Sequence, residues 1–465
     1  MSRRFRIRPA EKVLRRRPTD RMNAKFCFVC PVEGKVTAYD EFGIGPDMET
    51  RLADAVPVGA ASGPTGTAEV ALGRGLAVAA VLLVAIDLRP GIVSVGPILP
   101  SIIDEFGLSH ATAALLVTIP DLLMGLLALP TPWLVRRYGR DPVLLSALLL
   151  LCLSTLARSF SGNVTGLLLA TAGVGAGIAM AGALIAGFIK ARFPTKAAMM
   201  MGIYATALSF GSTISAGATG PVAANVAGGW RVASGMWSLL GLFAIVGWLA
   251  VAIREHRHRA AAGGVVRLPS HRLPLGNRTA WFIALYFACD NFLFYALLSW
   301  TAPMYREYGL SPTVAGLVLA SFTAVFMCAN PVFGWLSRSE DRRVGLAVSG
   351  GLTTLGLVLL ALAPTTAPFV VIPICAFGLG GGFTLGMTLP LDNTHSVEEA
   401  NVWNAFVLTV GYLIAAGGPL LVGIVRDLSG DFRPSIWLLA VVGGAMLLLS
   451  PFLRPHHQRS QVQVP

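Results

Sequence analysis

The sequence contains few charged residues, because Asp, Glu, Lys and Arg together make up only 13% of its 465 residues. A soluble globular protein usually has about 25%. This shortage excludes an ordinary soluble domain. Hydrophobic residues instead account for 54% of the chain, and glycine contributes 51 residues. Both values are typical of a polytopic membrane protein, whose helices tolerate glycine well.

Several chemical motifs are also missing. The six cysteines provide no disulfide framework, and the single CxxC pair, Cys27 and Cys30, has no second pair or nearby His to complete a zinc site. The sequence has no P-loop lysine motif for ATP and no recognisable pair of nucleophile and base. We therefore expect no metal, no cofactor, no nucleic-acid partner and no enzymatic activity.

Long apolar stretches are abundant, and twelve of them reach the roughly 20 residues that a helix needs to cross a membrane. A span must be a helix or part of a closed barrel, and these stretches are longer than barrel strands and do not alternate in polarity. The sequence therefore predicts an all-α membrane protein. The twelve predicted transmembrane helices are 74–95, 112–135, 143–160, 164–189, 197–224, 231–253, 280–304, 312–335, 343–363, 368–391, 400–425 and 432–453.

Lys and Arg are distributed unevenly between the predicted loops. With a cytoplasmic N-terminus, fifteen lie in inner loops, whereas the outer loops hold Arg158, Arg231, Arg306, Arg426 and Arg433. The positive-inside rule then predicts a multi-pass protein of a bacterial inner membrane with both termini in the cytoplasm. The net charge of +12 reflects this topology and contact with anionic membrane lipids.

The apolar region contains an internal repeat with an offset of 202 residues. GLSHATAALL, which begins at Gly107, resembles GLSPTVAGLV, which begins at Gly309, and further pairs recur at the same offset. The repeat predicts two parallel six-helix bundles, 74–253 and 280–453, joined by a cytosolic linker, 254–279. Residues 454–465 form a short C-terminal tail.

Residues 1–73 differ in composition from the rest of the chain. They are polar, mixed in charge and rich in Pro and Gly. We interpret this segment as a largely disordered cytosolic tail. Met22 and Met48 offer alternative start positions within it.

Four ionisable residues lie inside predicted spans: Asp87, Arg89, Asp121 and Asp290. Transporters built from two six-helix halves bind substrate between the halves near the membrane midplane, where a charge is tolerated. An unpaired Arg elsewhere in a span costs at least ~3 kcal/mol. We interpret Arg89 as a cation that faces an anionic or strongly polar substrate. The alternative is an ion pair with one of the three aspartates that locks helices together.

The three aspartates are the candidates for proton coupling. Asp121 is predicted to load the proton. Asp87 lies two residues from Arg89, so on a straight helix it points away from Arg89 and is predicted to contact an adjacent helix. Asp290 is the remaining candidate.

The seventh span supplies the other predicted substrate contacts. Asn291 corresponds to Arg89 at the offset of 202 and is predicted to lie across the cavity from it. Tyr295 and Trp300 on the same helix offer hydrogen bonds and an aromatic wall. Packing or anchoring at the membrane interface is the alternative role for these two aromatic residues.

The segments LRPGIVSVGPILPSI, FIKARFP, GGWR and FYALLSWTAPMYREYGLS, in this order, resemble the cyanate-permease and nitroimidazole-transporter branch of the major facilitator superfamily, over about residues 72–453. The resemblance implies the major facilitator fold and secondary transport of small solutes. Arg89 and Pro90 match the Leu-Arg-Pro signature of this branch.

A second resemblance concerns PWLVRRYGRDP, which is similar to the superfamily's loop between its second and third helices. Arg137, Gly139 and Arg140 match the basic-Gly-basic part of that loop, which implies a role in gating. Pro132 and Arg136 stand where the family usually has Gly and Asp.

We interpret the chain as a monomeric, proton-coupled secondary transporter that moves a small anion or polar organic compound by alternating access. An exporter of drugs or toxic metabolites is one alternative. A receptor or sensor that binds ligand without transporting it is another.

Overall fold

The computed structural model describes residues 64–128, 130–193, 197–259, 273–336, 341–394 and 397–454. Residues 64–454 belong to one compact unit, and residues 1–63 are a separate unit. The predicted tail up to residue 63, with Cys27 and Cys30, therefore lies outside the described residues. The same is true of residues 260–272 in the predicted linker and of residues 455–465 in the C-terminal tail.

Helices make up all the regular structure in the described ranges, which confirms the predicted all-α class. The N-terminal half contains α2 (Pro64–Asp87), α3 (Pro90–Val93), α4 (Val95–Phe106), α5 (His110–Ala128), α6 (Thr131–Tyr138), α7 (Arg140–Ser159), α8 (Val164–Arg192), α9 (Ala197–Asn225), α10 (Gly229–Gly235) and α11 (Ser238–Arg259). The C-terminal half contains α12 (Arg278–Glu307), α13 (Pro312–Leu336), α14 (Arg343–Leu362), α15 (Pro368–Asp392), α16 (Val397–Ala415), α17 (Gly417–Ser429), α18 (Arg433–Leu449) and the 3₁₀ turn η2 (Ser450–Phe452).

Eleven helical stretches in the described part are long and apolar enough to cross a membrane. The helix α9, with 29 residues, stands at the place of the remaining predicted span, 197–224. The first span differs most from its prediction, because it runs from Gly75 to Phe106 rather than ending at residue 95. Pro97 does not end it, since this proline lies in the first turn of α4, where its missing N–H leaves no hydrogen bond unmade.

The internal repeat is visible in the local backbone. Gly107 and Gly309 both have positive φ angles, 60° and 90°, at the ends of α4 and α12. The next residue of each repeat donates its N–H back to the preceding helix, from Leu108 to Ile103 O and from Leu310 to Tyr305 O. Such a left-handed position strongly favours glycine. The same short sequence therefore makes the same turn in both halves.

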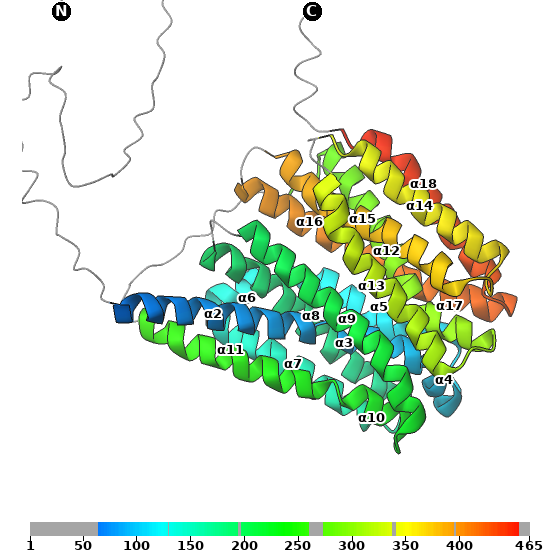
Figure 1. The fold of residues 1–465 in the computed structure, drawn as a ribbon, viewed down its shortest axis with the longest axis horizontal. Helices are drawn as coiled ribbons and strands as arrows, with labels where there is room; N and C mark the ends of the chain where they lie inside the picture. The colour runs from blue at the N-terminus through cyan, green and yellow to red at the C-terminus, as the bar shows by residue number, and fades with distance from the viewer. Residues whose placement is uncertain are drawn as a thin grey trace, which may run out of the picture. The chain divides into compact units, whose positions relative to one another are not determined.

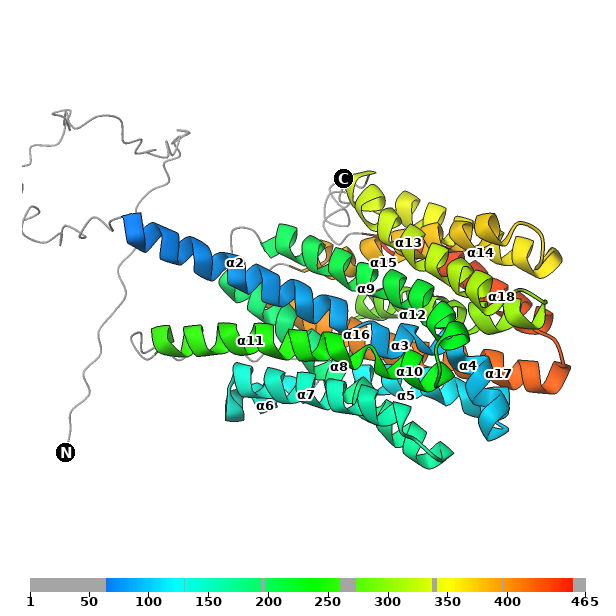
Figure 2. The same ribbon diagram turned by 60° about the horizontal axis from the view of Figure 1, so that its bottom comes forward.

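Helix pairing also repeats between the halves. In the N-terminal half, α8 packs against α5 and α7, and α11 packs against α2; in the C-terminal half, α15 packs against α13 and α14, and α18 packs against α12. Figures 1 and 2 show each set of helices grouped on its own side of the bundle. Packing of α9 on α13 and of α5 on α16 and α17 joins the two sets.

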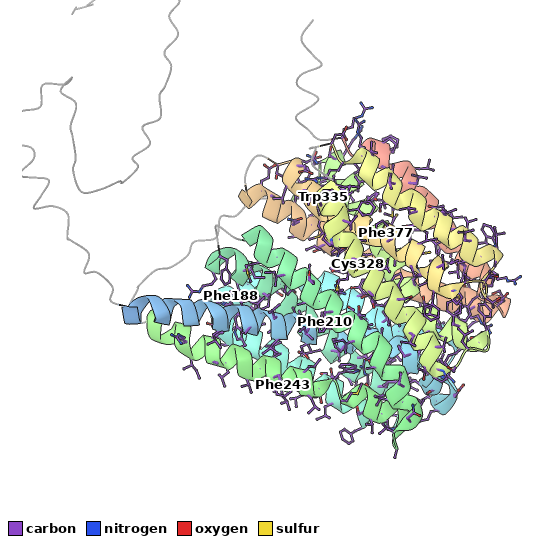
Figure 3. The ribbon with its side chains drawn as sticks, in the orientation of Figure 1. Phe188, Phe210, Phe243, Cys328, Trp335 and Phe377 are labelled. Atoms are coloured by element: carbon purple, nitrogen blue, oxygen red, sulfur yellow. The ribbon has the colours of Figure 1, made fainter. Side chains whose placement is uncertain are left out.

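Large apolar side chains cover much of the outer surface. Phe243 on α11 is 61% exposed, and it points away from the neighbouring helices in Figure 3. Many leucines on the outer helices are comparably exposed. Such a surface is unfavourable in water and suits the hydrocarbon interior of a bilayer.

Candidate functional site

Arg89 lies at a break in the first membrane span. The helix α2 ends at Asp87, and α3 begins at Pro90 after a two-residue turn. Pro90 has no backbone N–H to continue the ladder of α2, and the carbonyl of Arg89 accepts the first bonds of α3, from Ile92 and Val93. Irregular backbone at membrane depth occurs only where it is buried in protein or lines a water-filled cavity. The break therefore presents Arg89 at a position that a continuous helix would not provide.

Arg89 of the N-terminal half contacts the C-terminal half directly. Its Nη1 donates a hydrogen bond to the phenolic oxygen of Tyr295 at 3.3 Å. Arg89 also interacts electrostatically with Tyr204 on α9, Tyr412 on α16 and Asp121 on α5. Four helices thus bring polar side chains together around a single guanidinium group.

Arg89 forms no ion pair with any carboxylate in the described ranges. The helix-locking pair that we considered with Asp87, Asp121 or Asp290 is therefore absent from this conformation. Asp121 is fully buried, and neither of its carboxylate oxygens has a hydrogen-bond partner in the described part of the chain. Its interactions extend to Tyr295 and Tyr412 as well as to Arg89.

The other two aspartates lie away from this cluster. Asp87 is 4% exposed, and it interacts with Cys152 on α7, an adjacent helix. Asp290 is 1% exposed and lies inside the C-terminal half, against Gly382 of α15, where Ser349 of α14 and Met446 of α18 also converge. Neither aspartate interacts with Arg89.

Asn291 and Trp300 occupy different surroundings on α12. Asn291 is buried one helical turn before Tyr295, on the same face, and its Nδ2 donates to the carbonyl of Phe287. Trp300 donates its indole N–H to the carbonyl of Pro419 at 2.8 Å, and its ring lies 5.6 Å from that of His110. The indole N–H of Trp300 is therefore used in packing between helices in this conformation.

The predicted gating segment runs from the end of α6 to the first residue of α7. Arg137 stacks on Tyr138, with 5.4 Å from its guanidinium carbon to the ring centre, and Gly139 adopts a φ of 86°. Arg140 pairs with Asp141 at 2.9 Å and lies over the ring of Phe188 on α8, which is labelled in Figure 3. These contacts stay within the N-terminal half. The side chains of Pro132 and Arg136 lie outside the described part.

The corresponding segment of the C-terminal half has a different pattern. Arg342, which matches Arg140 at the offset of 202, pairs with Asp392 at the end of α15. Its neighbour Arg343 pairs with Asp341 at 2.5 Å and holds the pKa of that loop carboxyl below its usual value.

The two halves are also joined by a charged cluster at the other end of the spans, which we call the latch: His110, Glu307, Arg426 and Asp427. The carboxylate of Asp427, on α17, accepts the backbone N–H groups of His110 and Ala111 at 2.9 and 2.8 Å. The ring of His110 lies between Asp427 at 2.7 Å and Glu307 at 3.2 Å. Arg426 completes the cluster with Glu307 at 2.7 Å. A carboxylate at a helix N-terminus is favourable, so Asp427 acts as a cap for a helix of the opposite half.

The sequence interpretation did not identify Tyr204 and Tyr412, and it misplaced Arg158. Tyr204 and Tyr412 carry no motif, and the packing of α9 on α3 and of α16 on α12 brings them near Arg89. Arg158 was counted among outer-loop residues, but its side chain is 1% exposed and donates to Gly91 O and Ser234 Oγ. Arg158 lies inside the predicted span 143–160, and this position could have indicated that it is not a loop residue.

The chain is similar to several known proteins. The family model of the Major Facilitator Superfamily matches residues 81–419 and 281–464. The chain is 30% identical over 365 residues to the uncharacterized transporter YycB of Bacillus subtilis (strain 168), covering 77% of this chain and 88% of that protein. It is 29% identical over 376 residues to the cyanate transport protein CynX of Escherichia coli (strain K12), covering 79% and 95%.

Two further matches extend this comparison. The 2-nitroimidazole transporter of Escherichia coli (strain K12) is 29% identical over 378 residues, covering 80% of this chain and 92% of that protein. Among solved structures, a bacterial homolog of the human lysosomal transporter Spinster, in an inward-facing and occupied conformation, has a TM-score of 0.66 at 18% identity, covering 81% and 95%. That likeness concerns the fold. The matched relatives are transporters and not enzymes, in agreement with the sequence prediction.

Proposed function

Because the chain belongs to the Major Facilitator Superfamily, we propose that it is a proton-coupled secondary transporter that moves a small anion across the inner membrane by alternating access. Arg89 binds the anion between the two halves, and both termini lie in the cytoplasm. The observation that carries the proposal is Arg89 itself. It is a cation at a helix break, without an ion pair among the described residues, and it is hydrogen-bonded to the opposite half.

The names of the relatives support a small anion as substrate. Cyanate and the nitro group of 2-nitroimidazole both expose oxygen atoms that carry full or partial negative charge. A guanidinium group is planar and can donate two parallel hydrogen bonds to such oxygens. We infer that one Arg89-centred site serves this range of chemistry, and that the specific anion is set by the side chains around it.

The latch supports the alternating-access part of the proposal. The hydrogen bonds of His110 and Ala111 run from α5 of one half to α12 and α17 of the other, so the halves cannot separate at that end without breaking them. Nearby, Thr118 on α5 donates to the carbonyl of Ala416 across the same boundary. This conformation is therefore closed at the latch end. If the N-terminus is cytoplasmic, the latch end faces the periplasm.

Asp121 is the proposed proton carrier. It shares the Arg89 cluster and has no hydrogen-bond partner among described residues, so its charge depends on whether Arg89 is occupied by substrate. A bound anion would repel an ionised Asp121 beside it, so the occupied site favours the protonated carboxyl. Substrate and proton would thus load together.

Uptake by proteoliposomes that contain the purified protein tests the proposal. We expect Arg89→Ala to abolish accumulation of cyanate or nitrite, because the single cation of the site is lost. Arg89→Lys should retain weak transport, because Lys keeps the charge but not the planar fork. Arg231→Ala serves as the matched control, because it removes a cation that pairs with Glu105 outside the cluster. Normal uptake by the Arg89→Ala protein would remove Arg89 from the mechanism.

A further inference from the structure

Three tyrosines surround Arg89, and they come from three different helices. Tyr295 of α12 accepts the hydrogen bond from Arg89. Tyr412 of α16 packs edge-on against Tyr295, with 6.2 Å between ring centres and an angle of 63° between ring planes. Tyr204 of α9 interacts electrostatically with both Arg89 and Tyr412. The N-terminal half thus contributes one phenol and the C-terminal half two.

These phenols are accessible to different degrees. Tyr295 is 1% exposed and Tyr204 is 8% exposed, whereas Tyr412 and Arg89 are partly exposed. The ring of Tyr412 is held from behind by Phe287, at 6.4 Å between centres, and Tyr295 is held by Phe294 at 5.2 Å. The rings are therefore fixed by aromatic packing, while Arg89 and Tyr412 keep an accessible side.

We propose that Arg89, Tyr204, Tyr295 and Tyr412 form a binding site for a monovalent, weakly hydrated anion of delocalised charge, and that the three phenols determine this selectivity. The inference rests on the proposed function, since it names the substrate class of that same site. It adds two residues, Tyr204 and Tyr412, that the sequence does not mark.

The charge of the site favours a monovalent anion. Arg89 is the single cation among these four residues, and each phenol is a neutral group that can both accept and donate a hydrogen bond. A divalent anion would keep one negative charge without a counter-charge in a site of low dielectric constant, which is strongly unfavourable. Sulfate and hydrogen phosphate are therefore excluded by charge.

The phenols favour an anion that is weakly hydrated and whose charge is delocalised. Each phenol can donate only one hydrogen bond, so the site replaces only part of the water around a bound anion. An anion that is weakly hydrated therefore loses less hydration free energy when it enters the site. The flat aromatic rings also accommodate a linear or planar group beside the guanidinium plane. Cyanate, nitrate and thiocyanate meet these conditions.

Calorimetric titration of the purified protein with cyanate, nitrate, thiocyanate and sulfate, at matched ionic strength, tests the inference directly. We expect the three monovalent anions to bind and sulfate not to compete at tenfold higher concentration. Tyr204→Phe and Tyr412→Phe should each weaken binding about tenfold, the effect of losing one hydrogen bond to a charged group.

Tyr305→Phe is the matched control. Tyr305 is a fully buried tyrosine of α12 whose hydroxyl has no hydrogen-bond partner in the described part, so removing that hydroxyl should leave anion binding unchanged. Equal affinities for all three Phe variants, or sulfate binding as strong as nitrate binding, would overturn the inference. Normal selectivity in binding without any uptake by vesicles would instead contradict the proposed transport function and leave the site assignment intact.

Discussion

At the scale of single residues, the two acidic side chains nearest the helix break have different surroundings. Asp121 interacts with Arg89, whereas Asp87 interacts with Cys152 of α7 and forms no ion pair with Arg89. We predict that Asp121→Asn retains substrate exchange but loses accumulation driven by a pH gradient, because Asn cannot carry a proton. Asp87→Asn should keep most of the accumulation. Counterflow and pH-jump uptake in proteoliposomes distinguish the two effects, and the reverse pattern would exchange the roles of the acids.

Arg89 could be predicted from the sequence more easily than the side chains that surround it, for a physical reason. A charged residue in an apolar span costs free energy, so it can be recognised from the sequence alone. A tyrosine is common in membrane helices and marks nothing until packing shows which groups it faces. Tyr204 and Tyr412 were missed for that reason, and Tyr295 was identified only through its position near Asn291.

At the scale of helices, glycines set how closely α8 and α15 approach their neighbours. A Cβ atom added at Gly175 of α8 would lie 2.5 Å from the Cα of Pro120 on α5, and one added at Gly380 of α15 would lie 2.6 Å from the carbonyl oxygen of Phe326 on α13. Gly175 and Gly380 therefore make equivalent close contacts in the two halves. The abundance of glycine could be recognised from the sequence, but which helix each glycine meets could not.

We predict that Gly175→Ala destabilises the protein by about 1–3 kcal/mol, the usual cost of forcing extra atoms into a packed contact. Gly187→Ala on the same helix is the control. A Cβ atom there meets no atom within 4 Å, so alanine should be neutral or stabilising by up to about 1 kcal/mol. Thermal unfolding in detergent compares the two variants. Equal melting temperatures would show that the contact between α5 and α8 adjusts easily.

At the scale of the whole molecule, the number of spans and their duplication were predictable, whereas the conformation was not. Apolar length and the offset of 202 residues depend only on the order of residues in the chain. The latch depends on His110 and Asp427, residues 317 positions apart that meet only when the two halves close at that end. Charges at predicted span ends are common, so nothing in the sequence distinguished these from residues that face water.

The hydrogen bonds of the latch must break before the two halves can open at that end, and this opening can be measured. Asp427→Asn weakens the cap on α5 and the contact with His110, and loss of a helix cap costs about 1 kcal/mol, or roughly a fivefold change in an equilibrium. We predict that a cysteine at Thr118, in a background without the six native cysteines, then reacts about fivefold more with an impermeant thiol reagent added to intact cells. Thr118 is 3% exposed and faces the opposite half, so labelling reports opening at the latch end.

Glu105→Gln is the matched control for the latch variant. Glu105 pairs with Arg231 at 2.6 Å and accepts the indole N–H of Trp230, and all three residues belong to the N-terminal half. Its loss removes a comparable ion pair near the same end without releasing the two halves from each other, so labelling at position 118 should not change. Equal labelling in both variants would show that the latch does not limit opening. Labelling that increases only in inside-out vesicles would mean that the latch end faces the cytoplasm and that the proposed orientation is reversed.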